Sequence, residues 1–235
     1  MEHWFTSDLH FHHKNIIEGI SDWTDKTRCR KFASFEEHDN TLINNINKHV
    51  KENDTLWFLG DWSFGGIEQV WEFRKKLDCM NIHFIYGNHD HHIERNSQFE
   101  IPTNEEKEDI FHYKLELENH DYPNPRLVNT QDFFSETTYY KKHVIHNQLI
   151  IMSHYAMRVW DKSHKGAWML YGHSHGTLDI NNDDVAVKKY HRYRTMDVGI
   201  DTHPEFRPYH FDEIKSIMSS RKAFLDVDHH SPETN

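Results

Sequence analysis

Residues 3–17 read HWFTSDLHFHHKNII, and in them a short apolar segment leads directly into an aspartate and a histidine. A strand is predicted over residues 3–8, because aromatic residues there suit a pleated, half-buried surface. Asp8 and His10 then stand two residues apart at the end of this strand. Residues i and i+2 of an extended chain point to the same side, so both side chains are expected to reach into one site.

The rest of the chain repeats this alternation of short apolar segments with helical patterns. One helix is predicted after the capping box formed by Ser34 and Glu37, one from about Gly66 to Asp78, and one after Asp212. Strands that alternate with helices are typical of an α/β fold. Besides the first strand, strands are predicted over residues 55–60, 82–86, 148–153, 167–171 and 195–200.

Residues 91–143 interrupt the alternation with a polar, acidic stretch that contains Pro102, Pro123 and Pro125. We interpret this stretch as an insertion of partly irregular structure over the surface of a single domain that covers residues 1–225. Residues 226–235 are interpreted as a polar tail.

The composition excludes some classes of function. The 27 Lys and Arg residues against 38 Asp and Glu residues give a formal net charge of −11, which disfavours a general nucleic-acid coat. A nucleotide substrate held through bound cations stays possible. No apolar run exceeds five residues, so neither a membrane span nor a secretory signal is expected. The two cysteines have no CxxC spacing, and a reducing cytoplasm is the expected location.

Nearly every predicted strand ends in a side chain that could bind a metal. Ligands of open α/β sheets bind beyond the carboxyl ends of the strands, so these side chains are expected to converge. Carboxylate, imidazole and carboxamide ligands suit Mn, Fe, Zn or Ni, and manganese is the expected metal. Their number exceeds the need of one tetrahedral zinc ion, but two cations about 3.5–4 Å apart would use them all, and such pairs hydrolyse phosphate esters. The predicted ligands are Asp8, His10, Asp61, Asn88, His154, His173 and His175.

The motifs DxH, GD, GNHD, a single histidine after a strand, and GHxH, in this order, resemble the calcineurin-like metallophosphoesterase superfamily. The likeness is greater to its small bacterial and phage-type phosphoesterases, at SDLHFHHKNII (7–17), LGDWSFGG (59–66) and MDVGIDTH (196–203). It covers residues 3–90 and 148–214. The resemblance implies a four-layer sandwich of two mixed β-sheets flanked by helices.

The resemblance also implies a role for each motif residue. The ligands would form two sets, namely Asp8, His10 and His175 for the first metal, and Asn88, His154 and His173 for the second. Asp61 would bridge both metals, and a hydroxide shared between them would attack phosphorus in line. His89 would donate a proton to the leaving oxygen, with Asp90 orienting it, and such general acid catalysis typically contributes about 10²–10⁴ in rate.

Two further residues are candidates for substrate contact. His13 closely follows the DxH turn, and the guanidinium of Arg158 could hold a phosphate through two hydrogen bonds. Trp160 could stack on a base, but ordinary surface packing is the favoured interpretation. The favoured function is hydrolysis of a small phosphate mono- or diester of nucleotide type. A repair-type nuclease acting on DNA or RNA ends and a non-catalytic binding module on the same fold are the alternatives, and the oligomeric state is left open.

Overall fold

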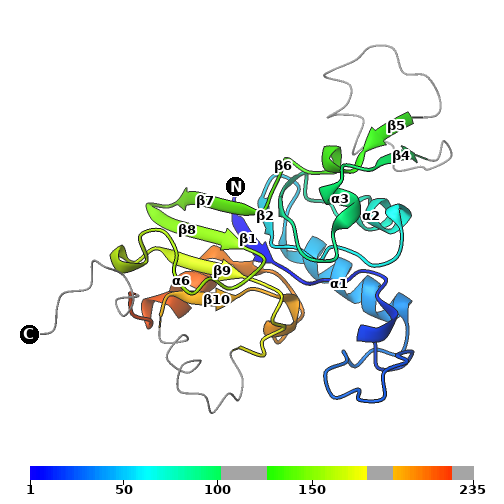
Figure 1. The fold of residues 1–235 in the computed structure, drawn as a ribbon, viewed down its shortest axis with the longest axis horizontal. Coiled ribbons are helices and arrows are strands. Elements are labelled where there is room, and N and C mark those ends of the chain that lie inside the picture. The colour runs from blue at the N-terminus through cyan, green and yellow to red at the C-terminus, as the bar shows by residue number, and fades with distance from the viewer. Residues whose placement is uncertain (102–125, 179–192, 224–235) are drawn as a thin grey trace, which may run out of the picture.

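The computed structural model describes residues 1–101, 126–178 and 193–223 of the chain. Within them, two β-sheets pack face to face and helices cover one of their outer faces (Figure 1). The five-stranded sheet has the order β11 (Tyr209–His210), β1 (His3–Thr6), β2 (Thr55–Phe58), β3 (Asn81–Ile85) and β6 (Glu136–Thr138). The four-stranded sheet has the order β10 (Thr195–Asp197), β9 (Trp168–Tyr171), β8 (Gln148–Ser153) and β7 (Tyr140–Ile145).

Both sheets are mixed, which confirms the predicted α/β sandwich. In the five-stranded sheet β1, β2, β3 and β6 run parallel, and only β11 is antiparallel to its neighbour. In the four-stranded sheet β8, β9 and β10 run parallel, and β7 is antiparallel to β8. The carboxyl ends of the parallel strands therefore lie at one end of each sheet, where the chain continues into the predicted ligands.

Helices α1 (Phe35–His49) and α2 (Ile67–Arg74) cover the outer face of the five-stranded sheet (Figure 1). The hydroxyl of Ser34 caps α1 by accepting from the backbone N–H of Glu37 at 3.2 Å, as the capping box predicts. Helix α2 ends before Asp78, the predicted limit. The buried guanidinium of Arg74 donates to the carbonyls of Leu77 and Cys79, which the chain presents after it leaves the helix.

A second core lies between the two sheets. Phe5 and Trp57 of the five-stranded sheet pack there with Ile150 and Leu170 of the four-stranded sheet. Helix α6 (Phe211–Ser219) closes this core through Ile214, together with its other buried apolar residues. On the outer face of the four-stranded sheet, a smaller cluster includes residues of connecting segments rather than of a described helix.

The described part of 91–143 contains more regular structure than the sequence indicated. Helix α3 (His91–Glu94) is followed by a two-stranded sheet of β4 (Gln98–Ile101) and β5 (Arg126–Asn129). Strands β6 and β7 belong to the two main sheets as edge strands. Edge strands carry polar and charged residues that protect their open side, and such a pattern gives little apolar signal. Residues 102–125 and the tail at 226–235 lie outside the described residues, and the single-domain assignment stays a prediction.

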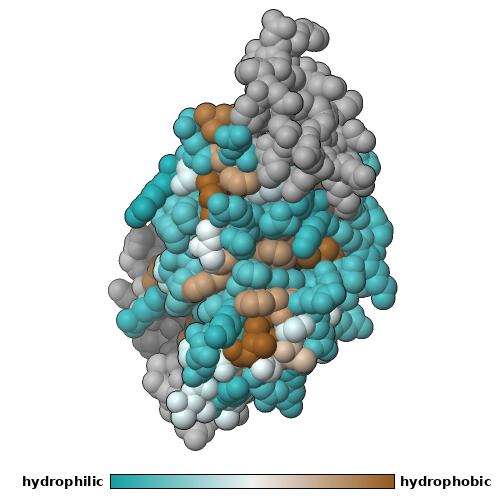
Figure 2. Space-filling model, turned by 90° about the vertical axis from the view of Figure 1, so that its right-hand side faces the viewer, coloured by the Kyte–Doolittle hydropathy of each residue, from teal (hydrophilic) through white to brown (hydrophobic). Residues whose placement is uncertain are grey.

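Short 3-10 turns complete the described structure, namely Lys14–Ile16, Thr130–Phe133, Ser163–Lys165 and Ile200–Thr202. Among the helices of the described residues, none has the length and apolar character that a membrane span requires. The face drawn in Figure 2 is mostly hydrophilic and carries separate small hydrophobic patches.

Candidate metal centre

The strand ends bring the predicted ligands together. The predicted ligands follow strands that end close to one another, namely β1, β2, β3, β8 and β9. Six of the seven predicted ligands form two groups, in each of which the possible ligand atoms lie within 4.8 Å of one another. The first group is Asp8, His10 and His175, and the second is Asp61, His154 and His173.

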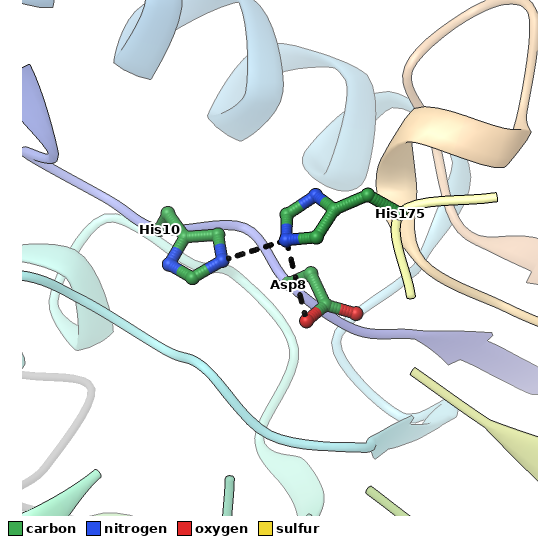
Figure 3. A group of neighbouring side chains, drawn as sticks. All are labelled: Asp8, His10 and His175. Carbon is green, nitrogen blue, oxygen red and sulfur yellow. Dashed lines mark hydrogen bonds and ion pairs between the residues drawn. The ribbon is translucent and has the colours of Figure 1, made fainter. Parts of the chain in front are cut away.

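The first group is compact (Figure 3), and two of its three side chains are buried. The Nε2 atoms of His10 and His175 face each other at 3.2 Å, and His175 Nε2 lies 3.9 Å from Asp8 Oδ1. Asp8 and His10 are almost fully buried, whereas the His175 side chain is 32% exposed. A ligand could therefore approach this group from the side of His175.

Asp61 lies between the two groups. Its Oδ2 atom is 3.7 Å from His154 Nε2 in the second group and 3.6 Å from His10 Nε2 in the first. Asn88 joins the second group, because its Oδ1 atom lies 3.0 Å from His154 Nε2. The geometry thus places all seven side chains around one site, with one carboxylate facing both halves.

Hydrogen bonds behind the ligands fix which imidazole nitrogen faces the site. His154 Nδ1 lies 2.7 Å from the carbonyl oxygen of Leu59, which can only accept, so Nδ1 carries the proton. His175 Nδ1 lies 2.6 Å from a carboxylate oxygen of Asp201 and donates to it. In the neutral imidazoles, both Nε2 atoms then present lone pairs to the site, the tautomer that binds metal.

These residues fit divalent cations. The lone pair of His154 Nε2 faces the carbonyl oxygen of Asn88, and Asp61 Oδ2 faces two imidazoles in a buried setting. Acceptors that face one another without a proton between them favour a positive charge there, most strongly where they are buried, as at Asp61 and His154. Burial also raises the pKa of Asp8 well above its ordinary value and lowers the pKa of His10 well below it. A bound divalent cation would lower the pKa of Asp8 back toward the charged form and would favour the neutral, metal-binding form of His10 still further, because it is the largest local charge.

Backbone conformation differs from what the spacing predicted. Five of the ligands adopt the left-handed conformation, with φ values of 57° at Asp8, 51° at His10, 58° at Asp61, 66° at His173 and 47° at His175. The i, i+2 argument for Asp8 and His10 assumed extended chain, and this assumption is wrong. Sharp turns aim the side chains instead, and they also end β1 and β2 earlier than predicted. Such conformations are costly for residues other than glycine and cluster at functional sites.

Glycines allow the turns to approach closely. A Cβ atom at Gly87 would lie 2.6 Å from the backbone nitrogen of Asp61 and 2.9 Å from Cε1 of His154. A Cβ atom at Gly172 would lie 2.6 Å from Oδ2 of Asp8. A side chain at either position would push a predicted ligand out of place.

Asp90 has a different role from the expected one. Its carboxylate accepts hydrogen bonds from the backbone N–H groups of Asp61 at 2.7 Å, Trp62 at 2.9 Å and Gly87 at 2.6 Å. It therefore ties the GD turn to the GNHD turn and does not orient the imidazole of His89. Burial, helped by the charge of Asp61, raises the pKa of Asp90 to about 7. The His89 ring lies beside His10, with ring centroids 5.5 Å apart.

The two predicted substrate contacts, His13 and Arg158, lie in different settings, and so does Trp160. His13 lies near the centre, with its ring stacked on Phe64 at 3.8 Å and 5.3 Å from His10, and burial lowers its pKa to about 4. Arg158 is exposed and makes no hydrogen bond or ion pair with the described part of the chain. Trp160 is 4% exposed and donates from Nε1 to the carbonyl of Ala167, so it packs inside the described structure and does not present its ring to a base.

The structure adds residues that the sequence analysis missed. The buried guanidinium of Arg30 forms two hydrogen bonds with the carboxylate of Asp201, both 2.7 Å long, and donates to the carbonyls of Asp8 and Leu9. Asp201 in turn holds His175. Asp201 lies within MDVGIDTH, so the motif itself was a signal, whereas nothing in the sequence indicated that Arg30 would pair with it.

Curated proteins resemble this chain over only part of its length. No family model matches the chain. An uncharacterized protein of Methanocaldococcus jannaschii is 38% identical over 86 residues, which cover 36% of this chain and 44% of that protein. The gene 66 protein of Mycobacterium phage L5 is 37% identical over 97 residues, which cover 37% of this chain and 39% of that protein. The matched segments thus span less than half of either relative.

One solved structure shows a similar fold. The crystal structure of a protein of unknown function from Aquifex aeolicus is similar over 92% of this chain and 98% of that one, with a TM-score of 0.54 and 20% identity. A novel archaeal phosphodiesterase is similar over 85% of this chain and 84% of that one, with a TM-score of 0.38 and 16% identity, which is too distant to bear on function. This chain therefore shares its fold with a solved protein, and its function has to be argued from the site.

Proposed function

We propose that this chain is a phosphoesterase that depends on two divalent cations, with manganese as the expected metal, and hydrolyses a phosphate mono- or diester. The observation that carries the proposal is the pair of ligand groups with Asp61 between them. The hydrogen bonds that direct Nε2 of His154 and His175 into the site support it, because such partners are typical of metal-binding histidines.

Each residue of the site would have a distinct role in metal binding or in proton transfer. Asp8, His10 and His175 would hold one cation and Asn88, His154 and His173 the other, with Asp61 shared between them. When bound, a pair of cations stabilises charge on phosphoryl oxygens and lowers the pKa of water. His89 would give a proton to the leaving oxygen of the ester. Asp90 would keep Asp61 and the GNHD turn in register through its three backbone contacts.

A small soluble ester of nucleotide type is the proposed substrate. The net charge of −11 disfavours a long polyanion, which would require a basic surface. A cytoplasmic location is part of the proposal, since both cysteines are free thiols.

The proposal is tested by loading the protein with Mn²⁺ and measuring hydrolysis of p-nitrophenyl phosphate and bis-p-nitrophenyl phosphate. Calorimetry on the same sample should give two cations per chain. Turnover should require the metal and should be lost with a chelator. Folded protein that binds two cations but cleaves neither ester with Mn²⁺, Fe²⁺, Zn²⁺ or Ni²⁺ would favour the binding module over the enzyme.

His89→Asn is expected to retain both cations and to lose rate by about 10²–10⁴, the usual contribution of a general acid. The loss should be greatest for esters with poor leaving groups, because these need the proton most. The rate constants of the variant and the wild type are to be compared across a series of substituted phenyl phosphates. His91→Asn, on the adjoining helix α3, is the matched control. Equal losses for good and poor leaving groups would contradict the role of His89.

A further inference from the structure

Tyr155 is an exposed aromatic residue placed directly against the second group of ligands. Its ring centroid lies 4.7 Å from that of His173 and 5.0 Å from that of His154. Its hydroxyl lies 3.5 Å from Oδ1 of Asn88, to which it can donate. In spite of these contacts, the residue remains 49% exposed. Tyr155 therefore contacts three predicted ligands and still presents aromatic surface to solvent.

An exposed ring at such a place can recognise a ligand. Aromatic rings supply large apolar faces with little conformational entropy to lose, since only two side-chain torsions are fixed. Bases stack on such faces with little dependence on their identity. A phosphate ester held at the metal centre must project its substituent away from the cations. Tyr155 is half exposed and lies against two ligands of the second group, so a substituent that leaves the centre on this side would meet its ring.

We propose that Tyr155 contacts a planar aromatic substituent of the substrate, either a nucleobase or an aryl group, while the phosphate occupies the metal centre. The inference rests on the proposed function and narrows its substrate class. The ring is carried into place by the same turn that delivers the ligand His154.

Trp23 offers a matched comparison. It is 44% exposed, similar to Tyr155, but its ring contacts His13 at 6.2 Å, and His13 lies 5.3 Å from the ligand His10. Trp23 is thus one residue further from the centre. Its replacement removes a comparable exposed aromatic surface without touching a predicted ligand.

The experiment measures binding of phosphonates, which cannot be hydrolysed, to the Mn²⁺-loaded protein by calorimetry. Methylphosphonate reports the metal centre alone, phenylphosphonate adds a planar ring, and cyclohexylphosphonate adds a puckered ring of similar size. The wild type should bind the phenyl compound more tightly than the other two. Tyr155→Leu should weaken phenylphosphonate binding by about 5- to 150-fold and leave methylphosphonate binding unchanged. Tyr155→Phe keeps the ring and should retain the preference, as should Trp23→Leu.

Activity gives an independent readout. Tyr155→Leu should raise KM for p-nitrophenyl phosphate and change kcat little, whereas a purely structural role in holding His173 would lower kcat and metal affinity together. Comparison of adenosine 5′-monophosphate with ribose 5-phosphate shows whether a nucleobase gives the same gain in affinity as a phenyl ring. Tighter binding with either the nucleobase or the phenyl ring supports the inference.

The outcomes separate the two proposals. If the wild type binds no methylphosphonate, the phosphate-binding metal centre itself is wrong. If methylphosphonate binds but neither the phenyl ring nor the base adds affinity, the inference about Tyr155 fails and the proposed function stands. The inference about Tyr155 also fails if Tyr155→Leu has no effect on phenylphosphonate binding. It fails likewise if only Trp23→Leu removes the preference for phenylphosphonate over methylphosphonate.

Discussion

Asp61→Asn is expected to remove metal binding and hydrolysis together, with the largest loss of any single replacement at the site. Asp61 is buried, and one of its oxygens faces imidazoles of both ligand groups, at 3.6 and 3.7 Å. The amide has nearly the same shape but no charge to share between two cations. The loss of metal affinity should exceed the about 10- to 100-fold that follows from loss of an outer hydrogen-bond partner.

Without metal, Asp61→Asn should not destabilise the protein and could make it more stable. A buried carboxylate without a cation is costly, so its removal should leave the melting temperature unchanged or raise it. The other oxygen of Asp61 accepts from the backbone of His89 at 3.0 Å, and the asparagine carbonyl can keep that bond. Calorimetry would count the bound cations, and thermal unfolding with and without Mn²⁺ would measure the stabilisation that they provide. Asp78→Asn, at an exposed position, is the control. A variant that still binds two cations and turns over would refute the shared position of Asp61.

Asp201→Asn is expected to lower both the free energy of unfolding and the affinity for metal. Its carboxylate pairs with Arg30, whose side chain is 2% exposed, and holds Nδ1 of His175. Removal of one partner of a buried ion pair costs about 3–5 kcal/mol, because the other charge stays buried. His175 would also lose the anion that orients its ring, which should weaken metal binding by about 10- to 100-fold.

The pH dependence has a definite sign. Burial alone would raise the pKa of Asp201, but Arg30 outweighs it and holds this pKa well below its usual range. Stability from Asp201 is therefore complete above about pH 4, the pKa of an unfolded aspartate, and is lost as the pH falls further. The stability difference between wild type and variant, measured by urea unfolding, should shrink over that range.

His175 provides a second pH signature. Burial alone would lower its pKa, but the hydrogen bond and charge of Asp201 raise it above the ordinary value. A proton at Nε2 competes with the metal, so the affinity of the wild type should fall as the pH drops below this raised pKa. In Asp201→Asn the pKa of His175 should fall, and the pH midpoint of metal binding should move to lower pH.

The double replacement of Arg30→Met with Asp201→Asn should recover some stability without recovering metal affinity. Recovery of both would mean that the pair acts only through folding.

Much of the fold follows from local patterns. The six predicted strands correspond to β1, β2, β3, β8, β9 and β10, and the capping box at Ser34 marks the start of α1 correctly. These elements carry apolar residues on a buried face, which makes their period visible in the sequence. The edge strands β6 and β7 were missed because their polar residues face solvent and their pairing depends on distant strands.

The candidate site was predictable in its residues but not in its geometry. Strand-end position and residue type were enough to select seven candidate ligands, and the structure brings all of them together. The directions of their side chains come from left-handed turns that no spacing rule indicates. Asp90 likewise serves the backbone of two turns rather than the adjacent His89, because its partners approach from the neighbouring strand end.

The sequence by itself determined the α/β class of the chain and the side chains offered at the strand ends. Both depend on short-range patterns, namely the period of the apolar residues and the residue types that follow each strand. The tertiary structure decided which nitrogen of each histidine faces the site and which aromatic ring remains open beside it. Leu59 and His154 are 95 positions apart and His175 and Asp201 are 26 apart, so only the packing of the two sheets brings these partners within hydrogen-bond distance.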